Sequence, residues 1–187
     1  MRTGKEGKPF MSLGVNVVLP AKSGINKTVE ISVAKDGGSQ EELANYPVGN
    51  RVEVVGTLTF HKKGEAFYLN LSATRINSFS AGSEDSIKGD IEFRGTLGNK
   101  IEEKKDKKGN PFCVFSAFSS EKNGENYDYT WIRFLQFGEN RKDWMQPKAG
   151  INAKGELQMS VYNDRLDIAC RVSEVSKWDK TANNPNT

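Results

Sequence analysis

The chain of 187 residues has few of the residues on which catalytic and metal sites depend. A single histidine, His61, rules out a histidine-rich metal site, and the two cysteines, Cys113 and Cys170, are interpreted as small core residues. No hydrophobic run approaches the ~20 residues of a membrane span. No signal peptide and no spacing motif of a nucleotide-binding or hydrolytic enzyme is recognised. We therefore expect a cytoplasmic, non-enzymatic protein with no metal, no cofactor and no membrane partner.

The charge of the chain is nearly balanced. The formal net charge is +3, from 27 Lys and Arg against 24 Asp and Glu. Basic and acidic residues number 10 and 9 in residues 1–86, and 17 and 15 in residues 87–187. This balance neither requires nor excludes a nucleic-acid partner.

Short alternating apolar runs, broken by Gly, Asn, Asp and Lys, predict an all-β protein. Helices are expected only at Ser39 to Tyr46, with Ser39 as the cap, and at Asn140 to Met145. Five strands in about 90 residues favour a small barrel in the second half. The predicted strands there are Ile91 to Leu97, Phe112 to Phe118, Thr130 to Phe137, Ile151 to Met159 and Leu166 to Val175.

An internal repeat indicates that this unit is duplicated. Three segments of the first half align in order with segments of the second half. At an offset of 102 residues, Lys5 to Phe10 align with Lys107 to Phe112, and Thr28 to Ile31 align with Thr130 to Arg133. At an offset of 99 residues, Gly56 to Leu58 align with Gly155 to Leu157. The predicted division is a first domain over 1–78, a linker over 79–86, a second domain over 87–178 and a disordered tail over 179–187. The first copy begins at the KEGKPF turn, so it lacks its first strand.

The second copy holds 12 of the 18 aromatic residues. Side chains alternate between the two faces of a strand, so Tyr127, Tyr129, Trp131 and Arg133 share one face. Aromatic rings interleaved with a cation can stack unpaired bases and hold their phosphates. An outward row is favoured because burying an unpaired arginine is costly. The alternative is that this row packs in the core.

Further candidates flank this row. Phe137 ends the same predicted strand, and core packing is the alternative interpretation of its ring. Tyr162 lies in the next hairpin, where a ring is poorly placed for a core. The charged loop from Lys100 to Lys108 is interpreted either as a solvated hairpin or as an electrostatic guide for phosphates. Its candidate contacts are Lys104, Lys105, Lys107 and Lys108.

Residues 89–175 resemble the bacterial-type single-stranded DNA-binding protein (SSB) family. The resemblance is carried by Gly95-Thr96-Leu97-Gly98, Gly109-Asn110, Thr130-Trp131-Ile132-Arg133, Phe137-Gly138, Lys148-Ala149-Gly150 and Gly155-Glu156-Leu157. It implies two tandem OB-folds, each a five-stranded Greek-key barrel, the first without its first strand. It also implies base stacking on Trp131, Phe137 and Tyr162.

Departures from the family concern the first copy and the end of the chain. Val29 takes the place of Trp131, and Lys35 and Lys63 lie near the places of Phe137 and Tyr162, so the first copy lacks a stacking platform. The chain ends in NNPNT instead of an acidic tail. Two domains per chain imply a homodimer where single-domain members form tetramers. Such a divergent protein fits a phage or other mobile element.

We therefore expect the chain to bind single-stranded DNA with little sequence specificity, protecting it in replication or recombination. Replication and recombination proteins are the expected protein partners. Two alternatives stay open: a protein-interaction OB module of a replication complex, and a single-stranded RNA-binding protein.

Overall fold

The computed structural model describes residues 1–21, 24–79, 82 and 84–180. The chain divides into two compact units, one of residues 1–18 and 28–86 and the other of residues 19–27 and 87–187. Parts of the predicted linker (residues 80, 81 and 83) and of the predicted tail (residues 181–187) lie outside the described residues. No described helix has the length and apolar character that crossing a membrane requires.

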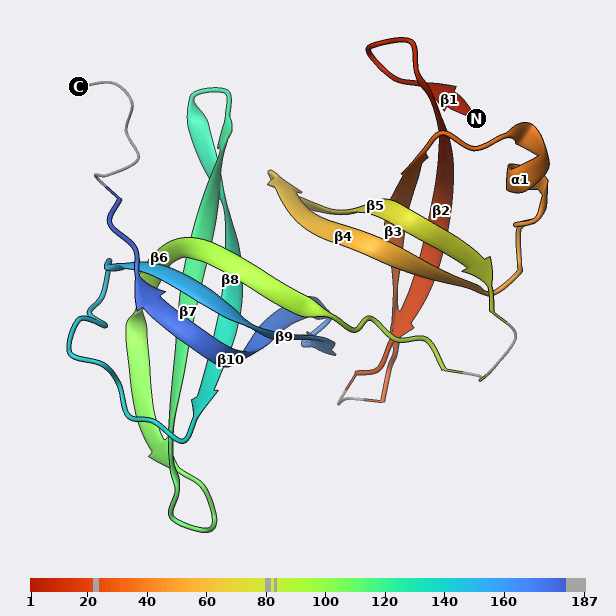
Figure 1. Cartoon of the computed structure of the whole chain (residues 1–187). Helices are drawn as coiled ribbons and strands as arrows, with labels where there is room; N and C mark the ends of the chain where they lie inside the picture. The colour runs from red at the N-terminus through yellow and green to blue at the C-terminus, as the bar shows by residue number, and fades with distance from the viewer. Residues whose placement is uncertain (22–23, 80–81, 83, 181–187) are drawn as a thin grey trace. The chain divides into compact units, whose positions relative to one another are not determined.

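The second unit is a closed barrel of five strands (Figure 1). An antiparallel meander β6-β7-β8 is followed by β9, which pairs with β6, and by β10, which pairs with β9 and runs parallel to β8. This Greek-key order is that of an OB-fold, which confirms the predicted fold class. The strands are β6 (Asp90–Lys105), β7 (Pro111–Asn123), β8 (Asn126–Phe137), β9 (Gly150–Tyr162) and β10 (Arg165–Lys177).

Aromatic rings fill the barrel of the second unit. Phe134 is completely buried, and its ring centroid lies 5.2 Å from those of both Phe93 and Phe115. The predicted core cysteines are buried too, and burial raises the pKa of the Cys170 thiol to about 11, so the thiol stays protonated.

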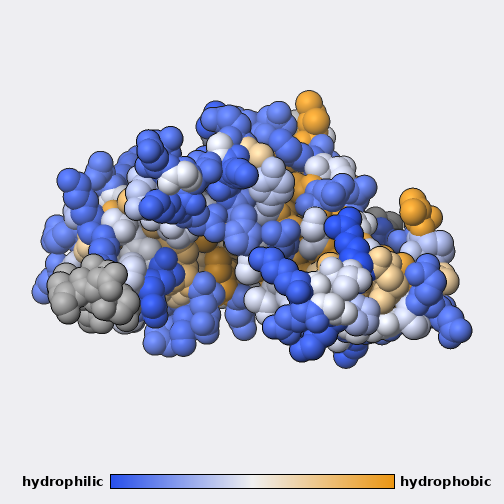
Figure 2. All heavy atoms as spheres, turned by 90° about the horizontal axis from the view of Figure 1, so that it is seen from above, coloured by the Kyte–Doolittle hydropathy of each residue, from blue (hydrophilic) through white to orange (hydrophobic). Residues whose placement is uncertain are grey.

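Outside the core, hydrophilic side chains cover most of the face seen in Figure 2, with smaller hydrophobic patches between them.

The first unit has the same strand order without closure. Its strands are β1 (Arg2–Thr3), β2 (Pro9–Leu19), β3 (Lys27–Asp36), β4 (Val52–Lys63) and β5 (Ala66–Ser78). They form one sheet in the order β1-β2-β3-β5-β4, in which β3 and β5 are parallel. The first unit has only the short strand β1 where the second unit has β6. This agrees with the prediction that the first copy lacks its first strand.

One of the two predicted helices is present. The helix α1 (Gln40–Ala44) begins after Ser39, whose hydroxyl accepts a hydrogen bond of 3.0 Å from the Glu42 backbone N–H. The helix predicted from Asn140 to Met145 is wrong. A turn replaces it, because the Arg141 N–H donates to the Glu103 carboxylate and the buried Met145 anchors the segment.

Equivalent turns and close contacts support the duplication. In the first unit the Gly4 N–H donates to the Lys8 carbonyl at 2.9 Å, and the Asp106 N–H donates to the Asn110 carbonyl at 2.9 Å in the second. At an offset of 99, Gly56 and Gly155 each lie against a backbone carbonyl that a Cβ atom would overlap. Both units therefore need glycine at this position, which lies in β4 of the first unit and in β9 of the second.

The predicted alignment of Thr28 to Ile31 with Thr130 to Arg133 is wrong by one residue. The Gly37 N–H donates to the Pro9 carbonyl, as the Gly138 N–H donates to the Pro111 carbonyl. The strand β2 therefore matches β7 at an offset of 102 residues, whereas β3 matches β8 at an offset of 101 residues.

That shift exchanges the two faces of β3 relative to the prediction. Glu30, and not Val29, takes the place of Trp131, while Asp36 takes that of Phe137. Burial agrees, since Ile31 and Val33 are buried like Ile132 and Phe134.

Candidate nucleic-acid interface

One face of β8 presents a row of half-exposed aromatic rings. Trp131 is 52% exposed, whereas the next residue, Ile132, is 3% exposed. Tyr127, Tyr129 and Phe137 are exposed on the same face as Trp131. This arrangement excludes the alternative in which the row packs in the core. The Tyr127 end lies in the β7–β8 hairpin, which projects from the barrel (Figure 1).

The neighbouring strand β7 adds two rings that sequence reasoning missed. The centroid of Phe118 lies 4.8 Å from that of Trp131 and 5.3 Å from that of Tyr129. Phe112 stacks on Phe137 at 5.6 Å. Together with Tyr127 these rings lie on one face of β7 and β8 in two groups, Phe118 with Tyr129 and Trp131, and Phe112 with Phe137. This face is called here the aromatic surface. It consists of Phe112, Phe118, Tyr127, Tyr129, Trp131 and Phe137.

A buried glycine supports the central ring of this surface. A Cβ atom on Gly98 would lie 2.9 Å from Cζ3 of Trp131 and 3.2 Å from the Ser116 carbonyl oxygen. The indole therefore lies directly against the β6 backbone. This contact positions the ring, while about half of the Trp131 side chain stays exposed.

Two arginines stand beside the rings. Arg133 Nη2 forms an ion pair with Asp167 Oδ2 on β10 at 2.7 Å. The guanidinium of Arg171 lies 5.2 Å from the centroid of Phe137, within cation–π distance. Sequence reasoning identified Arg133 but missed both Asp167 and Arg171. The parallel pairing of β8 with β10 brings these residues together.

Only one of the four predicted lysines joins the aromatic surface. Lys104 lies opposite Phe112 in the β6–β7 ladder, so both side chains share a face. Its ammonium forms an ion pair of 3.1 Å with Glu102, which also accepts from Lys100. The hydrogen bonds from Lys100 and Lys104 lower the pKa of the Glu102 carboxyl, so Glu102 stays charged and partly neutralises Lys104.

The other three lysines lie beyond the end of the aromatic surface. Lys105 pairs with Pro111 at the end of β6, and Lys107 and Lys108 lie in the following turn. Asp106 organises that turn, because its carboxylate accepts from the backbone N–H groups of Lys108 and Asn110, each at 2.8 Å. These three lysines therefore lie apart from the rings of the aromatic surface.

Tyr162 stands apart from the rings. It is 63% exposed and precedes a tight turn in which Asn163 and Asp164 have positive φ angles. None of the ring contacts found among the described residues involves Tyr162. Its hairpin nevertheless carries Asp167, which connects it to Arg133 on β8. Tyr162 is therefore available to a ligand that extends from β8 toward the β9–β10 hairpin.

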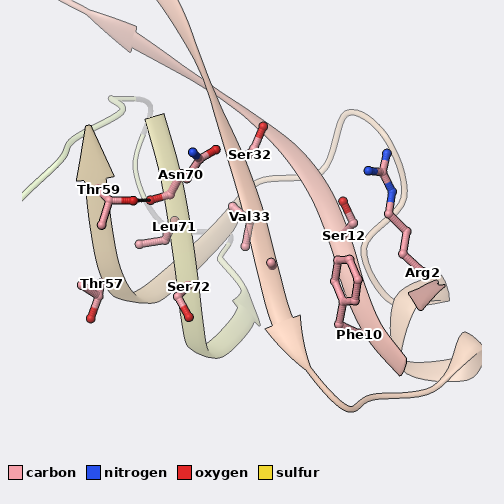
Figure 3. A pocket seen from close by; sticks show the side chains of 11 residues that line it. Arg2, Phe10, Ser12, Ser32, Val33, Thr57, Thr59, Asn70, Leu71 and Ser72 are labelled. Carbon is pink, nitrogen blue, oxygen red and sulfur yellow. Dashed lines mark hydrogen bonds between the residues drawn. The ribbon is translucent and has the colours of Figure 1, made fainter. Parts of the chain in front are cut away.

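The corresponding face of the first unit carries a groove lined by small polar and apolar side chains (Figure 3). Phe10, the equivalent of Phe112, is the single ring that lines it, and Arg2 lies at its edge. Glu30 and Asp36 are exposed on this face, where the second unit has Trp131 and Phe137. The remaining polar lining consists of Ser12, Ser32, Thr57, Thr59, Asn70 and Ser72.

The described residues contain no group of three or more His, Cys, Asp or Glu that could hold a metal ion.

No protein-family model and no curated protein matches the chain. Among solved structures, the chain is similar to the single-stranded DNA binding protein from Thermus aquaticus, with 14% identity over 96% of this chain and 86% of that one and a TM-score of 0.45. It is similar to PriB from Ralstonia solanacearum, with 16% identity over 50% and 100% of the two chains and a TM-score of 0.37. It is also similar to Plasmodium falciparum SSB in complex with ssDNA, with 17% identity over 52% and 100% and a TM-score of 0.39. The strand order, and not these similarities, establishes the fold described above.

Proposed function

We propose that the second unit binds single-stranded DNA with little sequence preference by stacking bases on the aromatic surface. The observation that carries this proposal is the set of six aromatic rings on one face of β7 and β8, with Arg133 and Arg171 beside them. Every base has a π face, so such a surface accepts any sequence, while the arginines can hold phosphates. Exposed apolar surfaces of this kind mark binding sites in general.

Stacking supplies most of the binding free energy in this proposal. Each stacked base contributes ~1–3 kcal/mol, so three bases on Trp131, Phe137 and Tyr162 suffice for about micromolar affinity. The ion pairs at Lys104 and Arg133 reduce the charge available to phosphates. We therefore expect a shallow salt dependence, with a slope of about −0.7 for each phosphate neutralised.

The first unit contributes little to this binding. Its corresponding face carries Glu30 and Asp36, whose charges repel phosphates. One binding surface per chain is the expected stoichiometry, and a homodimer would carry two. Protection of DNA during replication or recombination would follow from sequence-independent binding.

Tryptophan fluorescence tests the proposed function directly. Among the three tryptophans, Trp131 is the exposed one, while Trp144 and Trp178 are partly buried. Titration with an oligo-dT of about 35 nucleotides is expected to quench its emission strongly and saturably, because a stacked base quenches the indole. A matched oligo-U in competition measures the preference for DNA over RNA. Absence of quenching at tens of micromolar would reject nucleic-acid stacking and favour the protein-interaction module.

Substituting Asp167→Asn is expected to strengthen DNA binding by about two- to fivefold. The change releases Arg133 from its 2.7 Å ion pair and removes a negative charge beside the rings. The salt slope should become steeper by about 0.7, the amount for one further phosphate contact. Asp143→Asn, which changes the net charge equally on the 138–149 segment, is the control. Weaker binding of the Asp167 variant would mean that this carboxylate holds Arg133 in its binding orientation.

Substituting Gly98→Ala is expected to reduce affinity for oligo-dT by about three- to tenfold, the loss of part of one stacking contact. The added methyl group would overlap the Trp131 indole and displace it from its place beside Phe118. Fluorescence anisotropy of labelled DNA provides the measurement. Gly89→Ala, where a Cβ meets nothing within 4 Å, is the matched control. Equal affinities of the two variants would show that the position of the indole is unimportant.

A further inference from the structure

The first unit keeps a place for a strand that it does not contain. In the second unit β6 pairs with β9 through Asp90–Thr96 and with β7 through Thr96–Lys105. The equivalent strands β4 and β2 have no such partner between them among the described residues, apart from β1. Arg2 and Thr3 of β1 pair with Phe10 and Pro9 of β2. In the second unit, Lys104 and Lys105 of β6 pair in the same way with the equivalent residues of β7, Phe112 and Pro111. The open slot is defined here as the space between the free edges of β2 and β4.

The residues that line the open slot retain the pattern of the closed barrel. On β2 the lining residues are Met11, Leu13 and Val15, which correspond to Cys113, Phe115 and Ala117 of β7. On β4 they are Val52, Val54 and Leu58, which correspond to Ile151, Ala153 and Leu157 of β9. All six residues of the second unit are buried, at 8% exposure or less. In the first unit only Met11 is buried, and the other five are partly exposed. A strand in the slot would remove this apolar surface from water, which is favourable.

The backbone of the slot is also ready for pairing. The Leu157 N–H donates to the Gly89 carbonyl at the start of β6 at 2.8 Å, so the N–H of its equivalent, Leu58, points into the slot. The β2 segment from Met11 to Leu19 contains no charged residue. Proteins usually protect an exposed edge with charges or proline, and residues 11–19 of β2 carry neither.

At one point a side chain already occupies the edge. The Asp85 carboxylate accepts from the Val18 N–H at 2.8 Å and forms an ion pair of 2.8 Å with Arg51 at the start of β4. A carboxylate thus takes the place of one carbonyl of a paired strand. The remaining length of the β2 edge has no such substitute among the described residues.

We propose that the first unit is a strand acceptor, which binds an extended segment of another protein in the place that β6 has in the second unit. The segment pairs antiparallel with both β2 and β4. Its recognisable chemistry is that of β6, with large apolar residues at alternating positions such as Ile91, Phe93 and Leu97. The donor is a different protein, because every described strand of this chain is already paired within its own sheet. This binding is independent of the DNA-binding proposal.

A peptide with the sequence of residues 89–103, GDIEFRGTLGNKIEE, is the probe for this proposal. It ends before Lys104 because β1 already occupies the last two positions. Labelled peptide titrated with the full chain is expected to bind saturably at one peptide per chain. Hydrogen exchange should then slow at the amides of β2 and β4 and stay unchanged at those of β7 and β9. Saturating oligo-dT should not displace the peptide.

Two peptide variants provide matched controls without changing the protein. Replacing the phenylalanine that corresponds to Phe93 with aspartate puts a charge on the inward face, and affinity should fall by about tenfold or more. Replacing the glutamate that corresponds to Glu92 with glutamine changes the outward face and should leave affinity unchanged.

Three results would overturn the proposal. The first is no binding at about 100 µM peptide, a concentration well above the dissociation constant of a specific segment. The second is protection of β7 and β9 instead of β2 and β4. The third is a dimer of this chain that the peptide dissociates, which would assign the slot to a second copy.

Discussion

A Trp131→Ala variant is expected to bind oligo-dT about tenfold more weakly than the unmodified chain, or weaker still. The substitution removes the central ring of the aromatic surface, and one stacked base contributes ~1–3 kcal/mol. The fold should persist, because the Trp131 side chain is half exposed and lies on the barrel's outer face. Fluorescence anisotropy of labelled DNA gives the affinity, and circular dichroism reports the fold.

Glu30→Ala is the matched control for this experiment, since Glu30 has the equivalent position in the first unit. Its affinity for DNA should equal that of the unmodified chain or rise slightly, because a negative charge is removed. A Trp131 variant with undiminished affinity would reject stacking at this site. A Trp131 variant without a folded spectrum would show instead that the indole is needed by the barrel.

A Phe134→Ala variant is expected to lose about 3–5 kcal/mol of the second unit's free energy of unfolding. Phe134 is completely buried between the rings of Phe93 and Phe115, so the substitution leaves a cavity that the rigid barrel cannot fill. Urea denaturation followed by tryptophan fluorescence measures this loss. All three tryptophans lie in the second unit, so the signal reports the second unit alone.

Phe137→Ala, three residues further along the same strand, is expected to show the opposite pattern. Phe137 is 48% exposed, so its loss should weaken DNA binding while changing the free energy of unfolding much less. Equal losses of stability in the two variants would contradict the assignment of Phe134 to the core and Phe137 to the outer face.

The two faces of β8 could be predicted from the sequence because their side chains differ in kind. Arg133 between two apolar residues, Ile132 and Phe134, allows only one face to be buried. The strand β7 offers no such contrast, since Phe112 and Phe118 alternate with Phe115 and other apolar residues. Its outward rings could therefore not be recognised before the pairing of β7 with β8 was known.

Other features depend on pairings between distant segments. The ion pair of Arg133 with Asp167 exists because β8 and β10 are parallel neighbours, which local periodicity does not indicate. The one-residue shift in β3 is equally hidden, because the threonines at 28 and 130 suggest a match that the hydrogen bonds of Gly37 and Gly138 contradict. Sequence similarity between copies was thus sufficient to establish duplication, but it did not fix the register.

The absence of a β6 equivalent also affects how the two units fold. Closing the barrel of the second unit requires Asp90 to pair with Glu156. The chain between these two residues forms a long loop, and closing this loop costs conformational entropy before the contact forms. The first unit reaches its open sheet without that step, so its average contact is more local and its folding should be faster. As the first unit is also synthesised first, it can fold while the strands of the second are still emerging from the ribosome.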